Sequence, residues 1–139
     1  MSEPVAEILV VDDNPSDCEL ALAAFRREQP TPRVTAVDSG AEALDFLFCT
    51  GAHQHRTDQT LPKLVILDLN MPQMSGLEVL RRIRANPRTE ELAVIILTGS
   101  YDPDEIDQAL KLGATSYFLK PADLHEYMEM LRVIRNSWL

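Results

Sequence analysis

Basic residues are scarce in this sequence, and it contains no long hydrophobic run. The chain has 13 Lys and Arg residues against 22 Asp and Glu residues, which gives a formal net charge of −9. Nucleic acids and anionic lipid headgroups bind to basic surfaces. No apolar stretch approaches the roughly 20 residues that a helix needs to cross a bilayer. We therefore expect neither nucleic acid nor membrane to be a direct partner.

Cysteine is scarce as well, and the start of the chain lacks the features of a secretion signal. Cys18 and Cys49 form none of the spacings typical of metal or redox sites. Residues 1–4 lack a basic region and an apolar core. These absences predict a cytoplasmic protein with two reduced thiols.

Short apolar runs occur instead, and four of them are followed directly by polar residues. The four runs cover residues 8–11, 64–67, 94–97 and 117–119. Runs rich in Val, Ile and Leu without alternation are typical of strands buried on both faces of a parallel sheet. A weaker run over residues 33–37 predicts a further strand, at an edge of the sheet.

Helical patterns alternate regularly with these runs. Apolar spacing predicts helices over residues 15–27, 39–48, 76–85, 103–112 and 122–137. Five strands alternating with five helices predict an α/β fold with a doubly wound, five-stranded parallel sheet. At 139 residues we expect one domain, with a core over about residues 7–134 and a C-terminal tail over 135–139.

The stretch over residues 49–62 is polar and without periodicity. It is longer than most loops in compact domains, which indicates a functional or a mobile loop. His53 and His55 lie within it without a third metal ligand nearby, so we expect solvated side chains rather than a metal site.

The polar residues that follow the four runs suit phosphate chemistry. In chain order they are Asp12, Asp13, Asp68, Thr98 and Lys120. Parallel strands bring their carboxyl ends to one edge of the sheet, where open α/β sheets bind ligands. Three carboxylates placed together would repel each other unless a cation lay among them, and oxygen ligands suit Mg²⁺.

Asp68 is the natural nucleophile of this set, because an aspartate can attack a phosphoryl group and carry it as an acyl phosphate. Lys120 would supply a positive charge to one phosphoryl oxygen, and Thr98 a hydroxyl donor to another. Taken alone, each feature has an ordinary explanation as a helix cap, a turn or a strand end. Their coincidence at four strand ends favours phosphoryl chemistry.

These residues and their surroundings resemble the receiver domain of two-component response regulators. The matching segments are Asp12-Asp13, Asp68-Leu69-Asn70-Met71-Pro72, Gly76, Thr98-Gly99 and Lys120-Pro121. The resemblance covers about residues 7–134 and implies a flavodoxin-like (CheY-like) fold with strand order 2-1-3-4-5. It also implies that Asp68 accepts a phosphoryl group from a sensor histidine kinase or a histidine phosphotransfer protein. A receiver of this kind is no enzyme beyond its own phosphorylation and dephosphorylation.

The resemblance assigns roles to single residues. The implied Mg²⁺ ligands are Asp13 and Asp68, the backbone carbonyl of Asn70 and, partly through water, Asp12. Lys120 would pair with the phosphoryl group, and its bond to Pro121 is expected to be cis. Thr98 and Tyr117 match the switch pair, in which the hydroxyl moves toward the phosphate and the ring turns inward.

The polar loop over residues 49–62 and the ending over residues 136–139 resemble stand-alone regulators that partner phytochrome-type histidine kinases. In related regulators, a face made by the fourth helix, fifth strand and fifth helix mediates homodimers. The corresponding segments here are residues 103–112, 117–119 and 122–137, so we expect a homodimer through them. Trp138 would pack either on its own domain or in a partner.

Two other functional classes fit less well. Phosphatases of the haloacid-dehalogenase type carry a second aspartate two residues after the nucleophile, where this chain has Asn70, which cannot exchange a proton. A flavin mononucleotide carrier needs glycine-rich backbone amides for the phosphate, whereas the first loop here presents Asp12 and Asp13. A scaffold without the reaction would be expected to have lost Asp68 or Lys120. The sequence therefore favours a Mg²⁺-dependent response regulator in a phytochrome-type phosphorelay.

Overall fold

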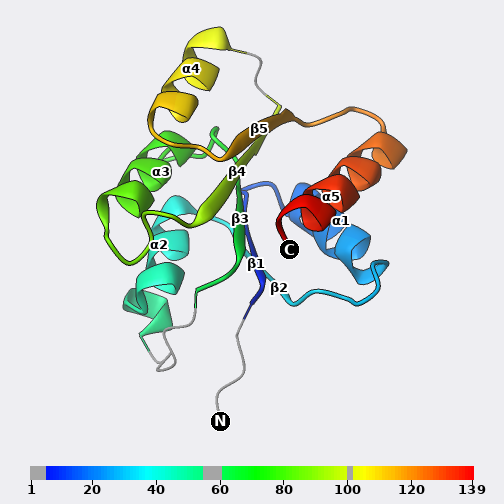
Figure 1. Ribbon diagram of the computed structural model, residues 1–139, viewed down its shortest axis with the longest axis horizontal. Helices are drawn as coiled ribbons and strands as arrows, with labels where there is room; N and C mark the ends of the chain where they lie inside the picture. Colours follow the sequence, from blue (N-terminus) through cyan, green and yellow to red (C-terminus); the bar gives the residue numbers. More distant parts are fainter. Residues whose placement is uncertain (1–5, 55–60, 100–101) are drawn as a thin grey trace.

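The computed structural model describes residues 6–54, 61–99 and 102–139 of the chain (Figure 1). Within these residues, five parallel strands form one sheet in the order β2-β1-β3-β4-β5. The strands are β1 (Ile8–Val11), β2 (Val34–Val37), β3 (Leu64–Leu67), β4 (Ala93–Thr98) and β5 (Ser116–Leu119). The α-helices are α1 (Pro15–Arg26), α2 (Gly40–Phe48), α3 (Gly76–Ala85), α4 (Pro103–Lys111) and α5 (Leu124–Trp138). The predicted fold class, strand order and helix number are confirmed.

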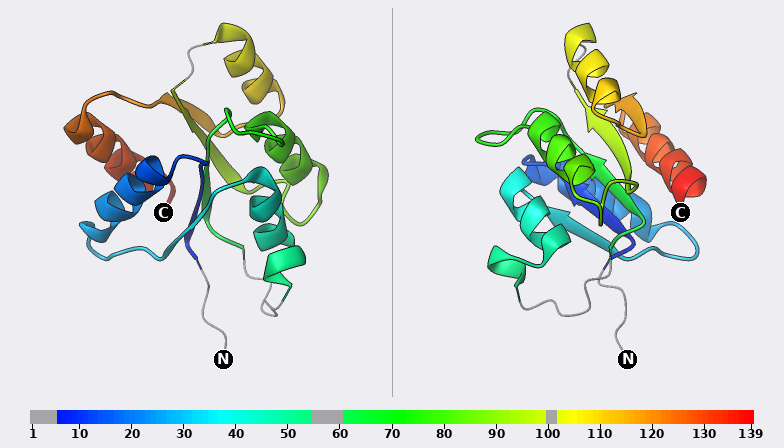
Figure 2. Two further views of the ribbon diagram at one scale, coloured as in Figure 1. Left: turned by 180° about the vertical axis from the view of Figure 1, so that it is seen from behind. Right: turned by 60° about the vertical axis from the view of Figure 1, so that its left-hand side comes forward.

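The sheet separates two layers of helices, and each layer covers its own hydrophobic core. Helices α1 and α5 lie on one face, and α2, α3 and α4 lie on the other (Figures 1 and 2). Successive strand residues point to opposite faces, so Ile8 and Ile66 join the first core while Leu9 and Leu67 join the second. Because β1 and β3 are buried at every position, their sequences are apolar throughout.

The two edge strands are less buried than the interior strands. In β2 only Val37 is buried, and no residue of β5 is buried. Because β2 lies at an edge of the sheet, its residues need not all be apolar, which explains the weak apolar pattern over residues 33–37. The predicted edge location is confirmed.

The C-terminal helix α5 packs its last turn against β5. Trp138 is half-buried, and its ring lies edge-on to that of Phe118 with the centroids 6.3 Å apart. Of the two environments that the sequence left open for Trp138, its own domain is therefore the one observed. In the described part of the chain, no helix combines the length and the apolar composition that crossing a membrane requires.

The loop after α2 begins with a short 3₁₀ helix, η1 (Gly51–His53), that the sequence did not predict. The prediction of a solvated His53 is wrong: its Nε2 lies 3.1 Å from Glu42 Oε2, and its ring packs edge-on against Phe46. Glu42 and Phe46 are four residues apart and share one face of α2, which gives the imidazole both a polar and an apolar contact. His55 lies outside the described residues.

Gly76, the first residue of α3, lies against the backbone that follows β3. Its N–H donates to the Leu69 carbonyl at 3.0 Å. A Cβ at this position would lie 2.7 Å from Leu69 Cα and closer still to the Asp68 carbonyl oxygen. The absence of a side chain therefore lets α3 begin directly beside Asp68.

We expect Gly76→Ala to destabilise the fold, because the added methyl group would displace the backbone of Asp68 and Leu69. Overpacking of this kind costs about 1–3 kcal/mol of unfolding free energy, which urea denaturation would measure. Gly99→Ala is the matched control, because a Cβ there would meet no described atom within 4 Å. Equal stability of Gly76→Ala and the wild type would show that this backbone relaxes without cost.

Candidate functional site

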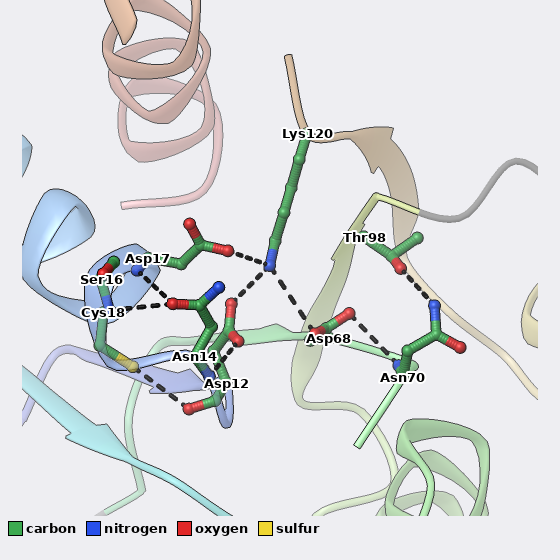
Figure 3. Close-up of polar contacts among 9 residues, drawn as sticks. All are labelled: Asp12, Asn14, Ser16, Asp17, Cys18, Asp68, Asn70, Thr98 and Lys120. Carbon is green, nitrogen blue, oxygen red and sulfur yellow. Dashed lines mark hydrogen bonds and ion pairs between the residues drawn. The ribbon is translucent and has the colours of Figure 1, made fainter. Parts of the chain in front are cut away.

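The carboxylates of Asp12 and Asp68 lie at the same edge of the sheet because β1 and β3 pair in parallel. Val11 pairs with Leu67 at the ends of these strands, and the Asp68 N–H donates to the Val11 carbonyl at 3.0 Å. Figure 3 shows the two aspartates beside each other, with Lys120 approaching from β5. The predicted convergence of strand ends is thus observed for these residues.

Asp13 adds a third carboxylate to the site. Asp12, Asp13 and Asp68 each offer an oxygen atom, and these atoms all lie within 4.8 Å of one another. Asp12 and Asp68 are only 5% and 7% exposed, so their charges are poorly solvated. Carboxylates this close repel each other unless a cation compensates them, and an all-oxygen set suits a hard divalent ion. The residues present therefore fit a divalent cation.

Lys120 supplies the positive charge of the site. Its backbone N–H donates to the Thr98 carbonyl at 2.8 Å, which fixes the start of the turn after β5. Its Nζ lies 2.7 Å from Asp12 Oδ2, 2.7 Å from Asp17 Oδ2 and 3.7 Å from Asp68 Oδ2. Burial alone would lower the pKa of Lys120, but the hydrogen bonds to Asp12 and Asp17 outweigh it and raise the pKa. The ammonium is therefore charged at neutral pH.

The environment of Asp68 makes its ionised form costly. Burial raises the pKa of Asp68, and the charge of Asp12 adds to this effect. The charge of Lys120 opposes it, as do hydrogen bonds from the Asn70 backbone and the Thr98 side chain. A further positive charge at the site would favour the carboxylate form, which is the nucleophilic one.

Asn70 and Thr98 are linked to each other beside Asp68. The Asn70 N–H donates to Asp68 Oδ1 at 3.3 Å, and the Asn70 side-chain amide donates to Thr98 Oγ1 at 3.2 Å (Figure 3). Thr98 is completely buried. Its hydroxyl is thus held within reach of any group attached to Asp68.

Tyr117 lies on β5, next to the strand that carries Thr98. Its half-buried ring packs against the core beneath α2, α3 and α4. Burial raises the pKa of the Tyr117 hydroxyl, and the nearby charges of Glu105 and Asp102 raise it further. The phenol is therefore neutral at physiological pH.

The prediction of a cis bond between Lys120 and Pro121 is wrong for this structure. Among the described residues the cis peptide bond is Gln29–Pro30. Trans is the more stable isomer before proline by about 0.5–1 kcal/mol. The Lys120 ammonium reaches Asp12 with the trans bond, so the contacts of the side chain do not require the cis form.

Asp17 is a member of the site that the sequence did not predict. It lies in the first turn of α1, where the Asn14 side chain accepts hydrogen bonds from the backbone N–H groups of Ser16 and Asp17. The sequence could have indicated Asp17, because the helix that follows β1 begins at the same edge of the sheet as Asp12.

Cys18 also contacts the site, through its thiol. The Sγ atom donates to the Asp12 carbonyl at 3.2 Å. Burial raises the pKa of the Cys18 thiol to about 11, and the charge of Asp12 contributes. The protonated thiol therefore acts here as a hydrogen-bond donor and is a poor nucleophile.

A profile of the response regulator receiver domain family matches residues 8–132. The chain is 33% identical to the probable methanogenesis regulatory protein FilR2 of Methanothrix harundinacea, over 95% of this chain and 83% of the relative. It is 29% identical to response regulator Rcp1 of Synechocystis sp., over 99% of this chain and 92% of the relative.

Solved structures give the same result. The phosphorylated cyanobacterial phytochrome response regulator RcpA is similar with a TM-score of 0.89 and 29% identity, over 97% of this chain and 94% of that one. The Mn²⁺-bound form of Rcp1 is similar with a TM-score of 0.87 and 28% identity, over 96% of this chain and 94% of that one.

We expect Lys120→Met to lower the free energy of unfolding at neutral pH by about 3 kcal/mol, because it leaves the buried charge of Asp12 uncompensated. An acid with a raised folded-state pKa, such as Asp68, takes up a proton on folding. Lys120 lowers the pKa of Asp68, so its removal raises that pKa further, and the loss should shrink as the pH falls through the Asp68 pKa of the folded variant. Urea denaturation over a range of pH would measure both effects.

Lys111→Met is the matched control for this substitution. Lys111 Nζ lies 2.9 Å from Asp107 Oδ2, but its side chain is 75% exposed. Exposed pairs contribute about 0–1 kcal/mol, so this variant should stay close to the wild type. Equal losses in the two variants would contradict the role of burial at Lys120.

Proposed function

This chain belongs to the response regulator receiver domain family and is close to phytochrome response regulators, and on that basis we propose that it is a phosphorylation switch. Asp68 accepts the phosphoryl group. The observation that carries the proposal is the setting of Asp68, a buried carboxylate at a strand end beside Asp12, Asp13, Thr98 and Lys120. This setting supports the proposal because it would provide an acyl phosphate with a nucleophile, cation ligands, a hydroxyl donor and an ammonium.

The reaction transfers a phosphoryl group from a histidine to Asp68. A carboxylate oxygen of Asp68 forms the new bond to phosphorus, and the bond between phosphorus and the imidazole nitrogen breaks. The electron pair of that bond stays on the imidazole. Lys120 and Thr98 then hold oxygens of the acyl phosphate, the first by charge and the second by a hydrogen bond. Water attack on the acyl phosphate returns the carboxylate and inorganic phosphate.

Mg²⁺ is the cofactor that we propose. The residues that would hold it are Asp12, Asp13 and Asp68, with the backbone carbonyl of Asn70, and their oxygen donors suit it. The acidic cluster supports this assignment, and the Mn²⁺-bound form of the similar protein Rcp1 is consistent with it. When bound, the ion supplies positive charge that neutralises the carboxylates and the phosphoryl oxygens.

Thr98 and Tyr117 form the switch that we propose. In the structure, the Thr98 hydroxyl is buried near Asp68 and accepts a hydrogen bond from the Asn70 side-chain amide. Tyr117 is half-buried on the adjacent strand. On phosphorylation the hydroxyl turns to the phosphoryl group, and the Tyr117 ring turns inward. The acyl phosphate thereby favours one of two conformations, and the surface around β5 changes with it.

A sensor histidine kinase of the phytochrome type, or a histidine phosphotransfer protein, is the partner that would supply the phosphoryl group. The support is the similarity to Rcp1 and RcpA over nearly the whole chain. We propose that residues 1–139 act as a single receiver domain in the cytoplasm. Its catalysis is limited to its own phosphorylation and dephosphorylation.

A homodimer through α4, β5 and α5 is the assembly that we propose. The exposed large apolar side chains of the described residues all lie on these three elements, namely Leu110, Leu119, Leu124 and Val133. Contiguous apolar patches mark protein interfaces, and the occurrence of these side chains on the three elements is what supports the proposed dimer.

Asp68→Asn should abolish phosphorylation, because the amide cannot form the acyl phosphate. We would incubate the protein with Mg²⁺ and a small acyl-phosphate donor and record intact-mass spectra. The wild type should gain a single phosphoryl group, and should gain none when Mg²⁺ is removed by a chelator. The control is Asp38→Asn, which changes an exposed aspartate directly after β2 and should leave the reaction intact. A phosphorylated Asp68→Asn variant would refute the assignment.

Leu110→Asp should weaken the homodimer, because it replaces an exposed apolar side chain of α4, within the proposed interface, with a charged one. Loss of a central interface residue raises the dissociation constant by about tenfold or more, which sedimentation equilibrium would measure. Ala41→Asp introduces the same charge at an exposed position of α2 and should leave dimerisation unchanged. Equal dissociation constants for Leu110→Asp and the wild type would place the interface elsewhere.

A further inference from the structure

Lys120 is held by two carboxylates, and one of them lies outside the cluster of cation ligands. Its Nζ lies 2.7 Å from Asp17 Oδ2, the same distance as from Asp12 Oδ2. The Lys120 side chain is 14% exposed and that of Asp17 is 24% exposed, so little water screens this pair. Asp17 belongs to α1, whereas Asp12 and Asp68 follow strands (Figure 3).

We propose that Asp17 is a positioning residue that competes with the phosphoryl group on Asp68 for the ammonium of Lys120. The inference rests on the proposed function, because it concerns the same acyl phosphate. Asp17 lowers the affinity of the site for the phosphoryl group, and phosphorylation releases it from Lys120.

The geometry supports competition rather than sharing. An ammonium has three N–H donors, and in the structure Asp12 and Asp17 each accept one of them. The distance of 3.7 Å from Nζ to Asp68 Oδ2 is too long for a hydrogen bond. Asp12 and Asp17 therefore hold the ammonium away from Asp68, and the contact with Asp17 opposes any movement of Nζ toward a group on Asp68. Asp12 follows β1, which pairs with β3 directly before Asp68, so an ammonium that moves toward Asp68 stays close to Asp12. Asp17 is therefore the partner that it leaves.

Asp17 cannot simply follow the ammonium. Its backbone N–H donates to Asn14 Oδ1 at 3.2 Å, within the capped first turn of α1. An aspartate side chain is short, and its carboxylate stays close to the helix that carries it. Movement of Lys120 toward Asp68 therefore lengthens the contact with Asp17.

Beryllofluoride, which mimics a phosphoryl group on aspartate, provides the test. Its affinity would be measured by calorimetry at saturating Mg²⁺ for the wild type and for Asp17→Asn, which keeps the shape of the side chain and removes its charge. We expect the variant to bind about fivefold more tightly, at the lower end of typical couplings between sites. Glu19→Gln removes one exposed charge from the same helix and should bind like the wild type.

A second pair of variants separates competition from general repulsion, because loss of any negative charge near the site would favour an anion. In a Lys120→Met background, competition for the ammonium is impossible, so adding Asp17→Asn should give only the smaller gain that comes from reduced repulsion. The same gain with and without Lys120 would overturn the proposal and leave only repulsion. Thermal melting of the free proteins would establish that each variant is folded, and Asp17→Ser would replace Asp17→Asn if that variant is not.

The outcomes distinguish this inference from the proposed function. If the wild type binds beryllofluoride and neither Asp17 variant binds it more tightly, the competition is refuted and the phosphorylation switch stands. If the wild type does not bind beryllofluoride with Mg²⁺ present, the proposed function fails, and the competition fails with it.

Discussion

The parallel pairing of β1 with β3 is the constraint on which the site depends. It runs from Ile8 opposite Leu64 to Val11 opposite Leu67, and it brings Asp12 and Asp68 to the same edge of the sheet. A slip of one residue would turn every side chain of a strand to the other face and would exchange the two cores. Because both faces are packed with apolar side chains, that slip is strongly disfavoured. The packing of the cores thus fixes the position of the carboxylates.

Unbalanced charge is the second organising feature. Four aspartates and one lysine meet at this edge, so the site holds an excess of negative charge that burial makes costly. The protein compensates part of it with the Lys120 ammonium, with the N–H of Asn14 on Asp12 and with the N–H of Asn70 on Asp68. These groups do not neutralise the site. The remaining negative charge attracts cations, and the oxygen donors select hard ones.

Much of this arrangement could be predicted from the sequence, because it follows from the strands. Interior strands are apolar at every position, and parallel strands end at one edge, so Asp68, Thr98 and Lys120 could be placed together without coordinates. Contacts that depend on a helix surface or on a turn could not be predicted in the same way. Asp17 reaches Lys120 only through the orientation of α1, and His53 packs on α2 because Glu42 and Phe46 share one face. The isomer before Pro121 depends on the local turn, and its prediction from the family was wrong.

The order of residues at the end of β5 has a mechanical consequence. Lys120 belongs to the polar site, and Leu119, directly before it, is one of the exposed apolar side chains. Consecutive Cα atoms are about 3.8 Å apart and are joined by a rigid peptide unit. Displacement of the Lys120 backbone therefore also displaces Leu119. No layer of packed side chains lies between the two residues. The buried site and the exposed apolar surface are therefore joined by a single peptide unit, so a change at one can alter the other directly.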